Sequence, residues 1–508
     1  MKKFILLLVV VFSIGFIDGQ TTRFSRLIES ANQTSELIQQ TTDGGYILIG
    51  NEIWGAYANG YLAKINSLGD TVWTRQYGDT NYVHFKGGQQ TLDGGYIITG
   101  SIGYSTTSDI YVLKTDSLGN VLWQKSISGS QEDNACSIKS TSDGGYILSG
   151  YSKSYGAGNF DMVVIKLDSI GNIQWNRILG QSGYDKLNSA SETSDGGYIV
   201  CGTLGASTFI AKLDSTGNTI WQKSFSEVGC FYKGKDAIQT SDGGYIVLGG
   251  KSFSPSVHHQ VILIKTDSLG TLMWSKKYSN TKITFQDFYS INITQSGKYI
   301  LAATDTFFMP LLILIENNGA TNWARKTMTA TPSSTFGTYT KETNDGGFIY
   351  TVTAPTTFAI SWINIIKTDS LGTSGCYDTT SAVYDSILTP ITTALSLSPV
   401  FGFSSSTLTI NTRWVGRNTS LCSILGISEQ KTDPISVYPN PSSGQFNFNG
   451  LEKESKIEVF DMSGKIIYQS TASGDFETIN ISEKAKGIYF YRITKEMKLV
   501  QSGKIAMQ

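Results

Sequence analysis

The sequence predicts an all-β fold, on three observations. Only 16% of the 508 residues are charged, whereas there are 53 Gly and 26 Tyr, a composition typical of extracellular β-structure. Short runs rich in Val, Ile, Tyr and Thr alternate with Gly- and Asp-containing turns, and no helical period of apolar residues accompanies them. Two motifs also recur about every fifty residues over the first 375 positions, so the architecture is repetitive.

The first motif is "TSDGGYILSG" at 141–150, and it has seven copies. Its Asp stands at 43, 93, 143, 195, 242 and 345, and the sixth copy has Ser296 in that place. A Gly-Gly pair behind an Asp can cradle a phosphate, hold a cation or form a tight turn. A phosphate loop opens a helix, whereas this motif joins two strand-like runs. We therefore predict a hairpin turn, in which Asp accepts local hydrogen bonds and Gly takes the positive φ.

The second motif, "KTDSLGNVLW" at 114–123, keeps step with the first. It ends at Trp73, Trp123, Trp175, Trp221, Trp274 and Trp323, and the seventh copy has Cys376 in the Trp position. A residue repeated once per unit is a poor candidate for a unique catalyst, and large aromatic side chains dominate packing. We predict that these Trp side chains fill the space between neighbouring units.

Each repeat reads as four strands, which in the third repeat are 136–141, 146–152, 161–168 and 173–179. Seven such units predict a seven-bladed β-propeller over residues 20–375. The seventh unit lacks its Trp strand, but Phe24 lies 19 residues before Asp43, much as Trp73 lies 20 before Asp93. We expect the segment 23–28 to close the ring as the outermost strand of the last blade.

This architecture predicts where a ligand binds. The two repeated turns lie on one face, and the variable connections lie on the other, where function usually resides. Aromatic and His side chains of these loops can stack on sugars or anchor a protein, although each alone more often packs its own loop. The candidate ligand-binding residues are Trp54, Tyr57, Tyr82, His84, Tyr104, Tyr155, Tyr184, Tyr232 and His258.

The second motif resembles the tryptophan-docking repeat of quinoprotein-type propellers, and more loosely the Asp box of sialidases. The first family implies a calcium-bound quinone beside a vicinal Cys pair, which is missing here, and the second implies an Arg triad, although Arg is scarce in the repeats. The chain has three His and neither HExxH nor GxSxG. We expect no catalytic residue, metal or cofactor. The alternative is a secreted, glycan-directed hydrolase with paired carboxylates on the variable-loop face.

The N-terminus predicts export. Lys2 and Lys3 precede an apolar run at 4–17, as in a signal peptide, here 1–19, and the run is short for a membrane span. The net charge of −1 argues against nucleic-acid binding, and we expect a monomer. Of five Cys, we expect Cys136 and Cys201 to be buried and Cys376 to pair with Cys422, since both flank one segment outside the repeats.

Residues 376–430 are rich in Thr and Ser and predict either extra strands or a spacer, with a linker at their end. Residues 431–508 then resemble the C-terminal sorting domain of the type IX secretion system of Bacteroidetes. The matching positions are Pro439, Asn440, Pro441, Gly444, Phe446, Asp461, Gly464, Lys465, Gly487, Tyr489 and Lys504.

That resemblance implies a small Ig-like β-sandwich, recognition by the type IX machinery, and passage to the medium or the cell surface. The short alternating strands separated by Gly turns agree with a sandwich. We therefore predict a secreted or surface-attached, non-catalytic protein, whose propeller is a binding or adhesion module for a polysaccharide or a surface protein.

Overall fold

The computed structural model describes residues 22–29, 33–54, 57–78, 82–104, 106–253, 260–279, 287–304, 309–327, 336–357, 360–375, 378–380, 384–389, 391–394, 404–407, 412–413, 417–424, 435–461, 465–495 and 498–507. They form two compact units, Met1–Ile424 and Leu425–Gln508. The predicted signal peptide lies outside the described residues. Every described element is a β-strand, so the all-β prediction is confirmed.

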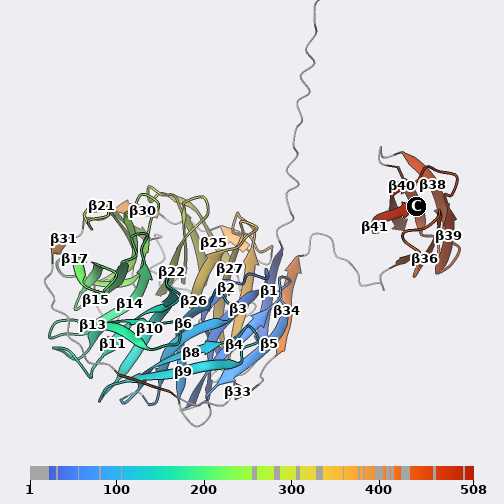
Figure 1. The fold of residues 1–508 in the computed structure, drawn as a ribbon. Coiled ribbons are helices and arrows are strands. Elements are labelled where there is room, and N and C mark those ends of the chain that lie inside the picture. Colours follow the sequence, from blue (N-terminus) through green and yellow to red (C-terminus); the bar gives the residue numbers. More distant parts are fainter. Residues whose placement is uncertain are drawn as a thin grey trace, which may run out of the picture. The chain divides into compact units, whose positions relative to one another are not determined.

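The described residues of the first unit form seven antiparallel sheets, one per repeat (Figure 1). The third contains β10 (Asp133–Ser140), β11 (Tyr146–Ser152), β12 (Asp161–Leu167) and β13 (Ile173–Leu179), within a few residues of the prediction. The first two repeats supply β2 (Gln33–Gln40), β3 (Tyr46–Trp54), β4 (Tyr57–Ile65), β5 (Thr71–Tyr77), β6 (Val83–Gln90), β7 (Tyr96–Ile102), β8 (Asp109–Thr115) and β9 (Val121–Ser128).

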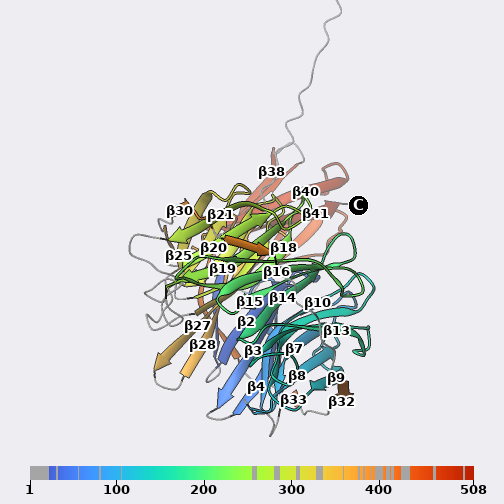
Figure 2. The same cartoon turned by 90° about the vertical axis from the view of Figure 1, so that its left-hand side faces the viewer.

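The later repeats follow the same order. Their strands are β14 (Asp185–Glu192), β15 (Tyr198–Leu204), β16 (Ser207–Leu213), β17 (Thr219–Ser226), β18 (Phe231–Gln239), β19 (Tyr245–Ser252), β20 (Gln260–Thr266), β21 (Leu272–Ser279), β22 (Asp287–Ile293), β23 (Tyr299–Thr304), β24 (Pro310–Ile315), β25 (Thr321–Thr327), β26 (Phe336–Glu342), β27 (Phe348–Thr357) and β28 (Ile360–Thr368). The N-terminal strand β1 (Arg23–Glu29) pairs with β28 in the last sheet. Each sheet contacts the next (Figures 1 and 2). The last repeat also contacts the first, through β26 and β2 (Figure 1).

The "DGG" motif is a hairpin turn between the first and second strands of a repeat, as predicted. Asp143 Oδ1 accepts hydrogen bonds from Thr141 Oγ1 at 2.5 Å and from the backbone N of Gly145 at 3.0 Å. Gly144 has φ +80°, a conformation that favours Gly. A Cβ on Gly145 would stand 2.3 Å from the Leu167 carbonyl oxygen. The two glycines therefore serve backbone geometry.

The two motifs meet through an ion pair. Lys166 of the second motif places Nζ 2.8 Å from Asp143 Oδ2, and its side chain is only 2% exposed. Equivalent pairs recur in five other repeats: Lys64–Asp43, Lys114–Asp93, Lys212–Asp195, Lys265–Asp242 and Lys367–Asp345. In the sixth repeat Ser296 replaces the Asp and Leu314 replaces the Lys. Both partners are lost together, so no buried ammonium is left without its carboxylate.

Each repeated Trp packs against the following repeat, which confirms the predicted role. Trp123 meets Tyr146 with ring centroids 6.1 Å apart, and Trp175 meets Tyr198 at 5.5 Å. A Cβ on Gly171, in the turn of the second motif, would lie 2.7 Å from the Trp123 ring. The Trp, the turn Gly and the motif Tyr therefore form one joint between neighbouring sheets.

Residues 378–424, which we call the outer belt, supply extra strands rather than a spacer. Its strands β29 (Asp378–Thr380), β30 (Tyr384–Ile387) and β31 (Ile391–Ala394) pair with β25, β21 and β17. Then β32 (Ser404–Thr407), β33 (Thr412–Arg413) and β34 (Arg417–Ile424) pair with β9, β5 and β1. The belt thus follows the sheets in reverse order. The side chains of Cys376 and Cys422 lie outside the described residues.

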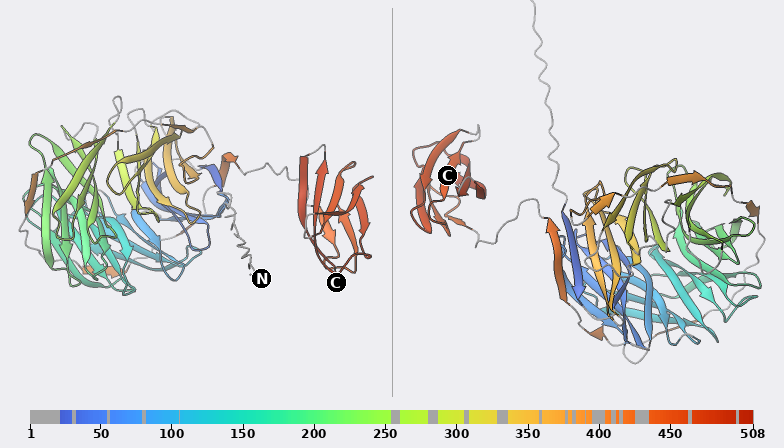
Figure 3. Two further views of the ribbon diagram at one scale, coloured as in Figure 1. Left: turned by 90° about the horizontal axis from the view of Figure 1, so that it is seen from above. Right: turned by 180° about the vertical axis from the view of Figure 1, so that it is seen from behind.

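The second unit is a small β-sandwich (Figure 3). One sheet contains β35 (Ser436–Tyr438), β36 (Gln445–Asn449) and β39 (Phe476–Asn480), and the other contains β38 (Ile466–Thr471), β37 (Lys456–Phe460), β40 (Gly487–Lys495) and β41 (Lys498–Met507). Side chains of both sheets share one core, in which the Phe448 and Tyr491 rings meet at 5.1 Å and 89°.

Several residues that match the sorting signature stabilise this sandwich through core packing or hydrogen bonds. Phe446 and Tyr489 lie in its core. The Asn440 side chain donates to the Lys504 carbonyl at 2.9 Å and accepts from the Ala506 backbone N at 2.9 Å, which fastens the first segment to the last strand. Asp461 Oδ1 accepts a hydrogen bond from the backbone N of Lys465 at 3.1 Å. Gly464 lies outside the described residues.

Candidate functional site in the central cavity

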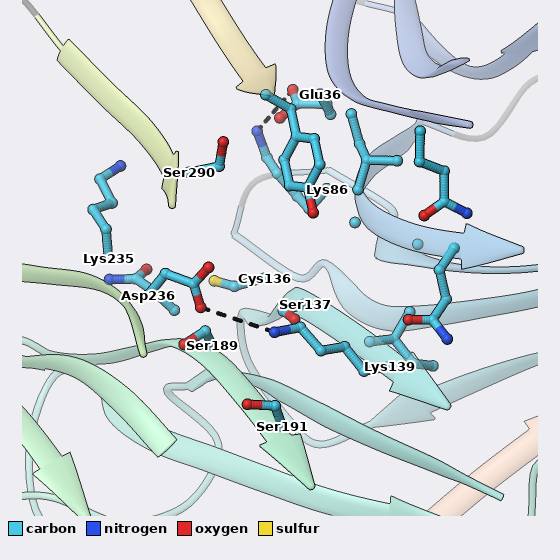
Figure 4. Close-up of a pocket in the computed structure, with 18 of the residues that line it drawn as sticks. Glu36, Lys86, Cys136, Ser137, Lys139, Ser189, Ser191, Lys235, Asp236 and Ser290 are labelled. Carbon is cyan, nitrogen blue, oxygen red and sulfur yellow. Dashed lines mark hydrogen bonds and ion pairs between the residues drawn. The ribbon is translucent and has the colours of Figure 1, made fainter. Parts of the chain in front are cut away.

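A cavity of about 970 Å³ lies among the first strands of the seven repeats. Residues of β2, β6, β10, β14, β18, β22 and β26 line it, so every sheet of the first unit contributes to one site (Figure 4). A site of this size lies within the range of ligand pockets.

Each first strand contains a β-bulge at the same position. The register shifts at Glu36, Lys86, Cys136, Asn188 and Lys235 in the first five repeats, seven residues before the turn Asp. A bulge leaves one residue outside the ladder and redirects its side chain. All five of these residues line the cavity. The two remaining first strands, β22 and β26, also shift register there.

A second set of lining residues stands four positions before the turn Asp, or before Ser296 in the sixth repeat. Its members are Gln39, Gln89, Lys139, Ser191, Ile238, Asn292 and Lys341. Both sets vary in residue type among the repeats, apart from Gln at both 39 and 89 and a recurring Lys in each set, while the turns and the Trp joints repeat. The cavity is therefore chemically asymmetric inside a regular frame.

The described lining carries more positive than negative charge. Its lysines are Lys86, Lys139, Lys186, Lys235 and Lys341, and its carboxylates are Glu36, Glu192 and Asp236. Lys86 Nζ lies 3.3 Å from Glu36 Oε1, and Lys139 Nζ lies 3.9 Å from Asp236 Oδ1 (Figure 4). Glu192 accepts hydrogen bonds at 2.7 Å from the backbone N and hydroxyl of Ser142 in the preceding repeat. Each carboxylate thus already has a partner.

Enclosure by protein shifts the titration of several lining groups. Burial raises the pKa of Glu36, although Lys86 opposes the shift. Burial, together with repulsion from Lys86, lowers the pKa of His84 to about 3, so this imidazole is neutral at physiological pH. Burial raises the pKa of the Cys136 thiol, which therefore stays protonated and weakly nucleophilic.

A series of contacting aromatic rings extends from the cavity to the loops of the third and fourth repeats. Tyr151 lines the cavity and contacts Phe160 at 5.0 Å between ring centroids, and Phe160 contacts Tyr184 at 5.5 Å. Lys186 Nζ lies 3.9 Å from the centroid of the Tyr151 ring, a cation–π distance. In the second repeat, Tyr82 stacks on His84 at 6.0 Å and 8°.

The predicted ligand-binding residues do not form one group. Among the six whose side chains the structure describes, His84 is the one that lines the cavity. Tyr104 and Tyr184 are exposed, by 55% and 60%, and Tyr155 packs partly buried against a core cluster. Trp54 and Tyr57 pair at the end of the β3–β4 hairpin, but their side chains, like all of His258, lie outside the described residues.

Tyr232 corrects the prediction. Its side chain is completely buried in a core cluster, and its hydroxyl donates a hydrogen bond to Glu227 Oε2 at 3.1 Å. It belongs to strand β18 rather than to an exposed loop. Cys136 also differs from the prediction, because it is only partly buried and lines the cavity, whereas Cys201 is fully buried as expected.

The sequence reasoning missed the cavity lysines and the bulge positions. The available signal was that residue type varies at fixed distances before a turn whose own sequence is repeated. Within the described residues, no group of three or more His, Cys, Asp or Glu side chains could hold a metal ion.

These features define an all-β protein, in which repeated antiparallel sheets surround a cavity and a β-sandwich forms a separate unit. Residues 436–508 match the family model of the secretion system C-terminal sorting domain. The protein is therefore secreted and attached to the outer-membrane surface, and its sandwich interacts with the secretion machinery. None of the described residues belongs to a helix long and apolar enough to cross a membrane.

Comparison with solved structures gives matches of low identity. Chaetomium thermophilum Sqt1, bound to the N-terminus of ribosomal protein L10, is 12% identical with TM-score 0.40, over 70% of this chain and 89% of that chain. Drosophila Plexin A in complex with Semaphorin 1b is 7% identical with TM-score 0.36, over 68% and 87%. PorZ of Porphyromonas gingivalis is 9% identical with TM-score 0.15, over 96% and 99%. The search of curated proteins found no match.

Proposed function

We propose that the first unit is a seven-bladed β-propeller closed by its N-terminal strand. Support comes from the contacts of Phe24, which meets Tyr46 at 5.9 Å as the repeated Trp meet their Tyr partners. Arg26 lies over the Phe24 ring at 5.7 Å, as Arg75 lies over Trp73 at 5.5 Å. The likeness to quinoprotein repeats stays a prediction.

A hydrogen bond between the last and first repeats also supports closure. The Asn344 backbone N donates to Gln40 Oε1 at 2.8 Å, and the Thr42 N donates to Gln90 Oε1 at 2.9 Å in the same manner. The last repeat is therefore joined to the first by the same contact that joins the first to the second.

This propeller acts, in our proposal, as a non-catalytic binding module displayed at the cell surface. The observation that carries the proposal is the pairing of the cavity carboxylates. A glycosidase needs one carboxyl as acid and a second as base or nucleophile, about 5–10 Å apart. Glu36 and Asp236 instead face lysines, and Glu192 is occupied by the neighbouring turn.

A glycan array combined with a product assay tests this function. The mature full-length protein is applied to the array, and every glycan that it retains is incubated with it in solution. We expect retention without new reducing ends. Cleavage that is lost in Glu36→Gln or Asp236→Asn would instead establish the hydrolase.

A further inference from the structure

The cavity keeps ammonium groups that its own carboxylates do not neutralise. Lys341 lines the cavity, and the described residues include no ion pair for it. Burial and repulsion from Lys139 lower the pKa of Lys341. Lys139 itself is held only loosely by Asp236, at 3.9 Å. Two like charges that line one cavity repel each other, and an anion between them relieves that repulsion.

The lysines of the lining, both those with and those without a carboxylate partner, come from different sheets. Lys86, Lys139, Lys186 and Lys341 belong to β6, β10, β14 and β26, and Figure 4 shows Lys86, Lys139 and Lys235 placed around the cavity. Burial also lowers the pKa of Lys186. A ligand inside the ring therefore meets positive charge from several directions, which suits more than one acidic group.

The neutral part of the lining suits a carbohydrate. Amide and hydroxyl groups occupy much of the remaining wall, in Gln39, Gln89, Asn188, Ser189, Ser191 and Asn292. They can donate to and accept from sugar hydroxyls. Tyr151 in the lining and the exposed Tyr184 offer rings against which sugar faces can pack, and the buried Phe160 holds the two rings in place. A simple inorganic anion requires neither feature.

We propose that the central cavity binds an acidic polysaccharide, with Lys139 and Lys341 contacting its carboxylate or sulfate groups and Tyr151 contacting a sugar ring. This inference rests on the proposed binding function and names its ligand class. Charge from both lysines reaches one ligand because β10 and β26 face the same cavity.

Calorimetric titration of the mature full-length protein tests the proposal. The probes are polygalacturonate, which carries carboxylates, dextran sulfate, which carries sulfates, neutral dextran, and polyglutamate as an acidic peptide. We expect one or both acidic glycans to bind, with affinity that falls as salt rises. Neutral dextran and polyglutamate should bind at least about tenfold more weakly, a difference of about 1.4 kcal/mol.

Charge-neutral variants locate the site. Lys139→Gln and Lys341→Gln should each weaken binding of the acidic glycan about tenfold or more, whereas Lys486→Gln, the same change at an exposed position of the sandwich, should not. Lys139→Arg keeps the charge and should retain most of the affinity. Unchanged melting temperatures show that the variants fold.

The outcomes separate the two proposals. Equal binding by wild type and both Gln variants, or preference for neutral dextran, overturns the acidic-glycan site but leaves a binding module. Binding of polyglutamate as tight as that of the glycans assigns the site to a protein ligand and is equally contrary to the inference. Absence of binding to both acidic glycans rejects it, and cleavage of a bound glycan rejects the non-catalytic function.

Discussion

At the scale of single residues, the pair formed by Asp143 and Lys166 explains why two motifs separated by about twenty residues vary together. The bond from Lys166 Nζ to Asp143 Oδ2, at 2.8 Å, ties the turn to the third strand, and Nζ also donates to the Leu167 carbonyl of its own strand at 3.0 Å. A buried ammonium requires its carboxylate, whereas a Ser–Leu combination requires neither. The sixth repeat has this Ser–Leu combination, at Ser296 and Leu314, in place of the ion pair.

A double-mutant cycle tests this pairing. Asp143→Ser leaves Lys166 buried without its carboxylate, and we expect the free energy of unfolding to fall by about 1–3 kcal/mol. The double variant Asp143→Ser/Lys166→Leu reproduces the sixth repeat and should recover at least half of that loss. Urea unfolding of the three proteins measures both values. A double variant less stable than Asp143→Ser alone would contradict the pairing.

The same pairs predict sensitivity to acid. Hydrogen bonds from Thr193 and Lys212 lower the pKa of Asp195 to about 2. For Asp143, burial acts in the opposite direction but is outweighed by Lys166 and Thr141, and its pKa is also about 2. Both pKa values lie below the ordinary 3.8, so the ionised carboxylates stabilise the folded state. This stabilisation is complete above about pH 4 and is lost as pH falls towards 2.

The melting temperature should therefore be steady from neutral pH to about pH 4.5 and should then fall steeply towards pH 2. Differential scanning calorimetry along this series measures the effect. A melting temperature that stays constant down to pH 2.5 would show that the paired carboxylates do not stabilise the folded state.

At the scale of elements, the joints between sheets rest on a Trp that fills the space above a turn Gly of the next repeat. Gly171 has φ +81° and a Cβ there would meet the Trp123 ring. Gly144 has nearly the same φ, +80°, but nothing lies within 4 Å of its added Cβ. A substitution at Gly144 therefore introduces backbone strain alone, whereas the same substitution at Gly171 also disturbs the packing of the Trp ring.

Gly171→Ala and Gly144→Ala are accordingly a matched pair. Both substitutions should lower the free energy of unfolding by about 1 kcal/mol, because Ala is strained at a positive φ. Gly171→Ala should lower the free energy of unfolding by about a further 1–3 kcal/mol, because the new methyl group displaces the Trp ring. Chemical denaturation compares them, and equal stabilities would mean that the Trp joint contributes little.

How much the sequence predicts differs between element types. The strands β11 and β13 were predicted at their observed bounds, because hairpin turns and alternating runs are local signals. The bulges at Glu36 and Lys86 escaped notice, because variation at one position resembles loop variation. Tyr232 lies three residues after Gly229 and looked like a loop residue, but its burial depends on the neighbouring strands. The belt pairings join residues far apart in sequence, such as Ile391 and Ser226, and no local pattern specifies them.

At the scale of the whole first unit, the outer belt covers the last strands of six of the seven sheets within the described residues. An uncovered outer strand presents unpaired N–H and C=O groups that can recruit another chain. The belt ends at β34, which lies against β1, so the N-terminal strand is paired on both sides. The belt thus protects sheet edges and holds the strand that joins the last repeat to the first.

Two truncations test this role. A chain that ends at residue 424 keeps the belt and should remain monomeric, with a melting temperature close to that of the first unit in the full chain. A chain that ends at residue 376 lacks the belt and should melt at lower temperature and self-associate through exposed edges. Size-exclusion chromatography and calorimetry provide the readouts. Identical behaviour of the two would show that the belt is dispensable.

The central claim is that the cavity holds the ligand, and amine labelling of the unmodified protein tests it most directly. The mature protein is acetylated briefly with and without saturating acidic glycan, and mass spectrometry follows each lysine. We predict that labelling of Lys139 and Lys341 slows at least about fivefold, as expected for groups in contact with bound anions, while Lys486 is unchanged. A glycan that binds but leaves both cavity lysines as reactive as before would contradict the account.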